Sequence, residues 1–271
     1  MTIEKLFIKN RKNQNVRVCI DAPIPGEMNP QKGLAFIMPG LGAHHNKLRF
    51  RSMAKILTLH GYVVISFDPT NSVGESDGNY ADATFTNYYE DLEDVISWAK
   101  ENLSNESSSL YMEPFILVGH SLGGMGVTLY TEKYPERVKA LAPLSATISG
   151  KLSIEARPKE EIEKWRTLGY QEKVRRSNGQ VNKLKWSHME DRLKYDNLVN
   201  AQNIKIPVLM VVGENDPVTP PKHQQLLFDA LGTAENKKEL HVVKNADHEA
   251  SSEESLPQVL DIFEKWLCKV A

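Results

Sequence analysis

Residues Phe115–Gly124 read Phe-Ile-Leu-Val-Gly-His-Ser-Leu-Gly-Gly, an apolar run followed by a glycine-rich turn and the start of a helical pattern. The pattern Gly-x-Ser-x-Gly between a strand and a helix is typical of a sharp turn that carries a nucleophilic serine. Side chains at Gly119 and Gly123 would collide with the neighbouring strand and helix, and the turn projects the Ser121 hydroxyl from the edge of a sheet. The helix that begins at Leu122 points its positive end toward that hydroxyl. We therefore predict a catalytic Ser121; the plainer alternative is a glycine-rich turn that packs closely.

Short apolar runs alternate with helical patterns on both sides of this turn. The predicted strands are Leu34–Met38, Tyr62–Phe67, Phe115–Val118, Val138–Ala142, Val208–Val212 and Glu239–Val243. The predicted helices are Leu48–Leu59, Asn87–Leu103, Leu122–Tyr134, Gln224–Leu231 and Leu256–Leu267. This alternation favours βαβ units and a mostly parallel sheet. The first 30 residues are expected to add one or two strands, ending in a turn cluster of Pro23, Pro25, Gly26 and Pro30.

Residues 150–200 interrupt the alternation, and they contain no convincing strand. The segment 151–200 carries 12 Lys and Arg against 8 Asp and Glu, a net charge of +4, whereas the whole chain has -2. We predict a helical insertion within a single domain that spans residues 1–271. It would form a lid in which Trp165, Tyr170 and Trp186 line a substrate pocket, or a peripheral hairpin whose aromatic side chains pack on the body. Its charge would favour an anionic acyl group or a coenzyme A thioester, unless it is a solvated face.

A carboxylate is expected after the strand Val208–Val212. A serine hydroxyl needs a base to take its proton, and the base needs a third group to fix its tautomer. In a sheet of this kind these groups follow in the order Ser, Asp or Glu, His. Asp216 lies just past the strand end and is the predicted acid; Glu214 is its rival but leaves the strand too early. The alternative role for Asp216 is a helix cap or an Asp-Pro turn.

The base is expected after the next strand, Glu239–Val243. His248 follows that strand in a loop at the same edge of the sheet, where an imidazole can reach both Ser121 and Asp216. The other histidines considered lie in predicted helix or strand, in the insertion, or beside the serine: His60, His120, His188, His223 and His241. We predict a triad of Ser121, His248 and Asp216.

Two backbone N–H groups are expected to form an oxyanion hole, because the tetrahedral intermediate of acyl transfer carries a negative oxygen. One is the N–H of Leu122, directly after the nucleophile. The other is the N–H of Leu41 in the loop Pro39-Gly40-Leu41-Gly42, where the glycines let the backbone turn inward. An ordinary strand-to-helix loop with Asn46 as the helix cap is the alternative, and it is compatible with an oxyanion role.

Composition excludes several other classes of protein. A chain that is 41% hydrophobic is not intrinsically disordered, and a net charge of -2 argues against a general nucleic-acid binder. No stretch approaches the roughly 18 continuous apolar residues of a membrane span, and Met1–Lys5 opens no secretory signal. Cys19 and Cys268 lie at opposite ends without metal-ligand spacing, which indicates unpaired thiols in a reducing cytoplasm, although terminal strands could bring them together.

The motifs together resemble the α/β-hydrolase superfamily, from about residue 30 to the C-terminus. Phe67-Asp68 with Gly74-Glu75-Ser76-Asp77-Gly78 is similar to small serine esterases of the monoacylglycerol-lipase-like group and to bacterial cinnamoyl or feruloyl esterases with short insertion lids. The resemblance implies an eight-stranded, mostly parallel sheet flanked by helices, an acyl-enzyme mechanism, and no cofactor or metal. Two departures bear on the substrate: Pro39-Gly40 stands where many relatives have His-Gly, and Asn71–Ser76 lacks the usual arginine.

The expected function is therefore a serine hydrolase that cleaves small-molecule carboxylic esters of small or medium acyl groups. The serine nucleophile argues against a haloalkane dehalogenase or an epoxide hydrolase. Enzymes of these two classes share the fold, but they carry aspartate at the nucleophile position. The triad does not separate an esterase from a thioesterase, acyltransferase, amidase, peptidase or carbon–carbon bond hydrolase. A non-catalytic binding protein of this fold is the alternative from another class, although such relatives usually lack a triad residue. The oligomeric state stays open.

Overall fold

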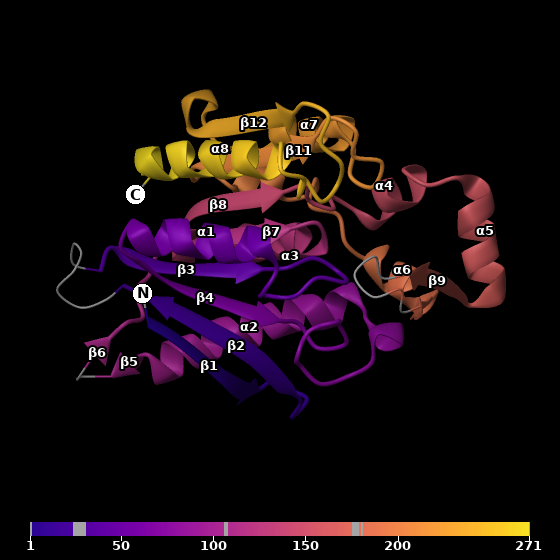
Figure 1. The fold of residues 1–271 in the computed structure, drawn as a ribbon. Coiled ribbons are helices and arrows are strands. Elements are labelled where there is room, and N and C mark those ends of the chain that lie inside the picture. Colours follow the sequence, from indigo (N-terminus) through magenta and orange to yellow (C-terminus); the bar gives the residue numbers. More distant parts are fainter. Residues whose placement is uncertain (1, 24–30, 106–107, 175–178, 180, 271) are drawn as a thin grey trace.

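A computed structural model describes residues 2–23, 31–105, 108–174, 179 and 181–270 (Figure 1). Within these residues eight strands form the main sheet: β1 (Thr2–Lys9), β2 (Asn15–Ala22), β3 (Gly33–Met38), β4 (Tyr62–Asp68), β7 (Phe115–His120), β8 (Val138–Leu144), β11 (Val208–Gly213) and β12 (Lys238–Val243). Their order in the sheet is β1-β2-β4-β3-β7-β8-β11-β12. β2 pairs antiparallel with both β1 and β4, and the remaining pairs are parallel. The predicted mostly parallel, eight-stranded sheet is confirmed.

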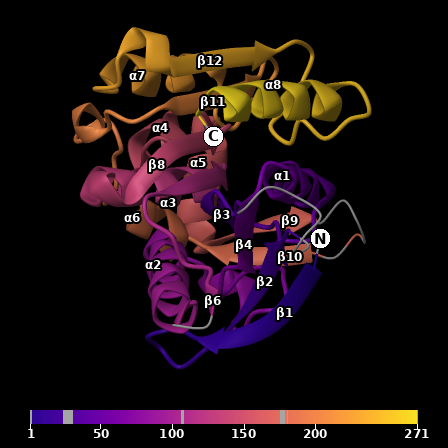
Figure 2. The same cartoon turned by 90° about the vertical axis from the view of Figure 1, so that its left-hand side faces the viewer.

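Helices cover both faces of the sheet. They are α1 (Leu48–Leu59), α2 (Phe85–Asn102), α3 (Leu122–Lys133), α7 (Pro221–Ala230) and α8 (Ser255–Val270). Single turns of 3₁₀-helix occur at η1 (Tyr80–Asp82), η2 (Pro135–Arg137), η3 (Ala201–Asn203) and η4 (Glu235–Lys237), and a short ladder joins β5 (Ser104–Asn105) to β6 (Ser108–Ser109). Figure 2 shows α1 and α8 on one side of the sheet and α2 and α3 on the other.

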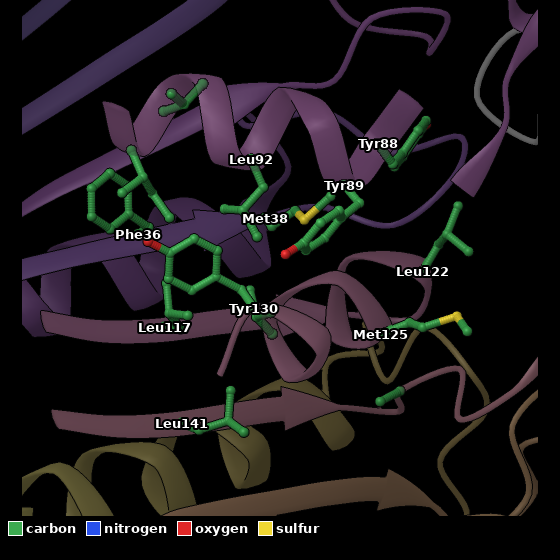
Figure 3. Packing of buried hydrophobic residues seen from close by; sticks show 14 of the residues in the cluster. Phe36, Met38, Tyr88, Tyr89, Leu92, Leu117, Leu122, Met125, Tyr130 and Leu141 are labelled. Atoms are coloured by element: carbon green, nitrogen blue, oxygen red, sulfur yellow. The ribbon is translucent and has the colours of Figure 1, made fainter. Parts of the chain in front are cut away.

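The alternation of side chains along β3 explains this three-layered arrangement. Phe36 and Met38 face α2 and α3, whereas Ile37 faces α1 and α8, and all three side chains are fully buried. Figure 3 shows Phe36 and Met38 packed with Leu117 and Tyr130 on the side of the sheet that α2 and α3 cover. Strands buried on both faces are apolar at nearly every position, which is why their sequence runs are continuous.

The predicted helices and strands match the observed ones to within a few residues. The helix α1 has the predicted bounds, while α7 begins at Pro221, three residues before the predicted Gln224. Proline fits the first turn of a helix because its fixed φ angle is already helical and its missing N–H would have no partner there. The predicted N-terminal strands are present as β1 and β2; of the predicted turn cluster, Pro25, Gly26 and Pro30 lie outside the described residues.

The insertion between β8 and β11 differs from its prediction. It holds α4 (Gly150–Glu155), α5 (Lys159–Leu168) and α6 (Ser187–Arg192), but also an antiparallel hairpin of β9 (Tyr170–Val174) and β10 (Val181–Lys185). The expectation that no strand lies in residues 150–200 was therefore wrong. Gly169, with a φ angle of 75°, ends α5 and turns the chain into β9.

The polar composition of the hairpin hides its strands. In β10 only Leu184 is buried, so hydrophobic alternation is absent, and the Lys183 ammonium lies 4.3 Å from the centre of the Tyr170 ring on the neighbouring strand. The dipeptide Asn178-Gly179, which is typical of hairpin turns, is the sequence signal that could have revealed it. In Figure 1 the insertion lies beyond the carboxyl ends of the parallel strands.

No helix in the described ranges is both long and apolar enough to cross a membrane. Cys19 is buried in β2 and Cys268 is exposed on α8, and both are free thiols.

Candidate active site

The turn after β7 holds Ser121 in an unusual backbone conformation. Its φ and ψ angles are 54° and -117°, and α3 begins at the next residue. A Cβ atom at Gly119 would lie 2.4 Å from the carbonyl oxygen of Gly123, and one at Gly123 would lie 2.3 Å from that of Met38. Only glycine fits these two positions, so the strain at Ser121 is held in place by close packing of strand and helix.

Ser121, His248 and Asp216 form one chain of hydrogen bonds. The Nε2 atom of His248 lies 2.9 Å from the Ser121 Oγ, and its Nδ1 atom lies 2.8 Å from the Asp216 Oδ2. Because the carboxylate accepts, Nδ1 donates to Asp216 and Nε2 is left to accept from the serine hydroxyl. The rival carboxylate, Glu214, instead accepts the backbone N–H of Asn245 at 2.9 Å. The structure thus brings together the three residues that the order of the strands selected.

The carboxylate of Asp216 is buried and well supplied with donors. It accepts the backbone N–H groups of Val218 and Thr219 at 2.8 and 2.9 Å, and the Thr219 hydroxyl at 2.8 Å. Burial alone would raise the pKa of Asp216, but the hydrogen bonds from His248 and Thr219 lower that pKa to about 2. Asp216 is therefore ionised at neutral pH and holds the tautomer of His248. The role of Thr219 was missed, although an Asp side chain often accepts backbone N–H groups just after it in a turn.

His120 was given no role in the sequence analysis beyond its place beside the serine. In the structure it supports the loop that carries His248. Its buried Nε2 donates to the backbone carbonyl of His248 at 3.0 Å. Burial and the positive charge of Arg49 hold the pKa of His120 well below its usual range, so the ring is neutral. Arg49 itself pairs with Glu249 at 2.8 Å. Two tethers therefore anchor this loop, one at the His248 carbonyl and one at the side chain of the next residue, Glu249.

The loop after β3 lies directly against the serine. A Cβ atom at Gly40 would approach the Ser121 Cβ to 2.9 Å, so the loop passes as close as a glycine allows. In the described part of the chain, the N–H groups of Leu41 and Leu122 donate to no protein acceptor. An oxyanion hole requires such free N–H groups, and this role of Leu41 and Leu122 stays a prediction. The end of this loop carries no side-chain cap: Lys47, not Asn46, precedes α1.

Asp68 fastens the far end of the same loop. Its buried carboxylate accepts the backbone N–H of His45 at 2.6 Å, the His45 Nδ1–H at 2.9 Å and the backbone N–H of Glu75 at 2.9 Å. Among the described residues, His45, Asp68 and Glu75 are a group whose ligand atoms lie close enough together to hold a metal ion. Asp68 is already satisfied by these donors and Glu75 pairs with Arg17 at 2.7 Å, so the cluster acts as a tether.

The aromatic residues of the insertion pack mainly with one another. Trp165 is 3% exposed, its Nε1 donates to the Leu184 carbonyl at 3.0 Å, and its ring meets that of Trp186 edge-on at 5.4 Å. Trp165 and Tyr170 also line a pocket of about 480 Å³ between α5 and β9. Trp165 thus serves as the core of the insertion, while contact of Trp165, Tyr170 or Trp186 with a substrate stays a prediction.

The sheet order and the serine turn after its central strand are those of the α/β-hydrolase fold. The chain belongs to the prolyl oligopeptidase family, whose sequence profile matches residues 48–271. It is 26% identical over 228 residues, 72% of this chain and 76% of the relative, to an uncharacterized 31.7 kDa protein of the traX-finO intergenic region in Escherichia coli.

Two further relatives have descriptive names. The chain is 26% identical over 222 residues to palmitoyl-protein thioesterase ABHD10, mitochondrial, of Bos taurus, a match that covers 80% of this chain and 66% of the bovine protein. Est1E from Butyrivibrio proteoclasticus, solved with ferulic acid bound, superimposes with a TM-score of 0.79 over 98% of each chain. Its sequence identity is 18%, so this likeness concerns the fold alone.

Proposed function

We propose that the protein is a serine hydrolase that cleaves carboxylic esters of small or medium acyl groups through an acyl-enzyme. The observation that carries the proposal is the continuous hydrogen-bond chain from the Ser121 Oγ through His248 to Asp216. Its distances of 2.9 and 2.8 Å lie within the range that proton transfer needs. A buried, ionised carboxylate behind a neutral imidazole is the arrangement that turns a serine hydroxyl into a nucleophile.

The reaction follows from these positions. His248 takes the proton of Ser121 as the Oγ attacks the acyl carbon, and Asp216 stabilises the imidazolium that forms. The N–H groups of Leu41 and Leu122 receive the negative oxygen of the tetrahedral intermediate. Protonated His248 then gives its proton to the leaving alcohol, and a water molecule repeats both steps to release the acid.

A thioester is the second candidate substrate, because the bovine relative is named a palmitoyl-protein thioesterase. The same triad would expel a thiol in place of an alcohol, and thiols are the better leaving groups. A peptide-type substrate is included in the test as well, because the family to which the chain belongs takes its name from an oligopeptidase.

The proposal is tested by steady-state hydrolysis with purified protein and its Ser121→Ala variant. We expect turnover of p-nitrophenyl acetate, butyrate and octanoate, with activity in the variant lower by about 10⁴-fold or more. Butyryl thioester and proline p-nitroanilide substrates run in parallel show which leaving group is preferred. Equal rates for both proteins on every substrate, in folded samples, would remove the proposal.

A cytoplasmic setting is part of the same proposal. Cys19 and Cys268 are free thiols, and unpaired cysteines persist in reducing compartments. Fractionation of the native host, followed by detection with an antibody to the protein, tests this setting directly; recovery outside the cytoplasm would contradict it.

A further inference from the structure

Two arginines of the insertion, Arg157 and Arg192, carry positive charge that no ion pair with another described residue neutralises. Arg192 ends α6 and is 7% exposed, and Arg157 follows α4 in a half-buried position. Within the described residues, neither guanidinium forms an ion pair, and the Arg192 Nε has no hydrogen-bond partner. Buried arginines are normally paired, because removing an unpaired charge from water is costly.

The acidic groups nearby are engaged elsewhere. Asp191, next in sequence to Arg192, accepts the backbone N–H and the hydroxyl of Thr86 at 2.8 and 2.7 Å and pairs with Lys194 at 3.0 Å. Glu161 acts on Arg157 only at longer range, and its side chain is exposed. No acid of the described chain therefore neutralises the two guanidinium groups.

The hydrogen-bond partner of the Arg192 guanidinium is the ring of His188. The His188 Nδ1 donates to the Ala83 carbonyl at 2.9 Å, which leaves its Nε2 to accept from an Nη2 of Arg192. Burial, and then the charge of Arg157, lower the pKa of Arg192 to about 9. Arg192 thus remains charged at neutral pH, and the charge of Arg157 adds to the electrostatic cost of burying it.

A path of contacts joins Arg192 to the loop after β3. Through His188, Arg192 is linked to the carbonyl of Ala83, which directly follows the turn η1 that holds Tyr80. The Tyr80 Oη also lies 3.7 Å from where a Cβ atom would stand at Gly42, the residue after Leu41. On the other side, Arg157 sits 5.7 Å from the centre of the Trp165 ring. Arg157 thus lies beside one of the predicted aromatic residues, and Arg192 is linked to the loop that carries Leu41.

We propose that Arg157 and Arg192 bind an anionic oxygen group, a carboxylate or a phosphate, carried by the ester substrate. This inference rests on the proposed function and names its substrate class. A guanidinium offers a planar fork of donors that matches both groups, and the free Nε of Arg192 is one such donor. Binding the anion would supply the countercharge that the protein leaves out, so substrates with a second, charged end would be preferred over neutral ones.

The test compares matched esters in the wild-type protein and in the variants Arg157→Gln and Arg192→Gln. Mono-p-nitrophenyl glutarate is paired with p-nitrophenyl pentanoate, and 1-butyrylglycerol 3-phosphate with monobutyrin, so that carboxylate and phosphate are judged separately. We expect each variant to lower the ratio of kcat/KM for the preferred charged ester to that for its neutral match by about 10- to 100-fold, mainly through KM. The control Arg166→Gln removes an exposed arginine from the same insertion and leaves the ratio as it was.

A binding measurement separates this proposal from the proposed function. In the Ser121→Ala background, calorimetry with glutarate and with glycerol 3-phosphate reports anion binding without any turnover. We expect Arg192→Gln to weaken this binding more than Arg192→Lys does. Such a graded loss supports the site even where no ester is cleaved. A charged-to-neutral ratio near one in the wild type, or equal losses on both esters in folded variants, overturns it. If Arg192→Gln does not fold, the Arg192→Lys and Arg157→Gln variants decide by the same ratio.

Discussion

The edge of the sheet and the insertion differ in how they compensate charged side chains. At the edge, Asp216 accepts from the Val218 and Thr219 backbone, from the Thr219 hydroxyl and from His248. In the insertion, Arg157 and Arg192 form no ion pair with a carboxylate of the described chain, and Glu161 and Asp191 act on them only from a distance. A charge whose partners are built in keeps one geometry at all times, as a catalytic base requires. A charge without a partner is instead available to a ligand.

Removing the charge of Asp216 should have the largest effect on activity. Asp216→Asn keeps the shape of the side chain but favours the wrong tautomer of His248, so kcat should fall by about 10⁴-fold while the fold is retained. Ester hydrolysis followed over pH, with circular dichroism as a check on folding, measures this. Glu214→Gln is the matched control, since that side chain serves only the Asn245 backbone. A larger loss in the control than in Asp216→Asn would reassign the acid.

A buried carboxyl group, that of Glu132, sharpens the comparison through stability. Glu132 on α3 is 7% exposed, and neither of its carboxylate oxygens has a hydrogen-bond partner among the described residues. Burial, with a contribution from Asp196, raises the pKa of Glu132 to about 8. The folded protein therefore keeps a proton that the unfolded chain loses near pH 4.5, the ordinary value.

The sign of the pH effect follows from that difference. The stability that protonated Glu132 allows is complete below pH 4.5 and is lost as pH rises toward about 8, at up to about 1.4 kcal/mol per pH unit. Glu132→Gln should remove this loss and unfold at a higher urea concentration than the wild type at pH 8. Urea midpoints at pH 6, 7 and 8 measure it; parallel pH profiles for both proteins would contradict the account.

The tether behind His248 should have a smaller effect. His120→Phe keeps the ring volume but removes the donor to the His248 carbonyl, so kcat should fall up to about 10-fold with little change in KM. His120→Gln, which can still donate, should recover part of the loss. If both variants retain the full kcat, the neutral ring only fills space and the loop is held by Arg49 and Glu249.

Sequence reasoning reached the sheet and the serine turn because both depend on local patterns. Continuous apolar runs such as Phe115–Val118 indicate strands buried on both faces, and Gly119 and Gly123 mark the one turn where only glycine fits. The order of the strands then selected Asp216 and His248, which lie within hydrogen-bond distance of each other.

The features that sequence reasoning missed depend on contacts between distant segments. The hairpin of β9 and β10 is held largely by polar cross-strand pairs, so no hydrophobic period reveals it. His120 acts on a residue 128 positions away, and the isolation of Arg192 is visible only once Asp191 is seen to serve Thr86. The net charge of the insertion pointed toward an anion, but it could not say which of its arginines lacked a partner.

Covalent labelling of the serine tests the central claim most directly. Purified protein is treated with a fluorophosphonate, which reacts with serine hydroxyls that an adjacent base has activated, and the adduct is located by mass spectrometry. The account predicts one adduct, on Ser121, that disappears in Ser121→Ala and is strongly slowed in Asp216→Asn. A folded protein that remains unlabelled at Ser121, or that is labelled at the same rate when Asp216 is changed, would contradict it.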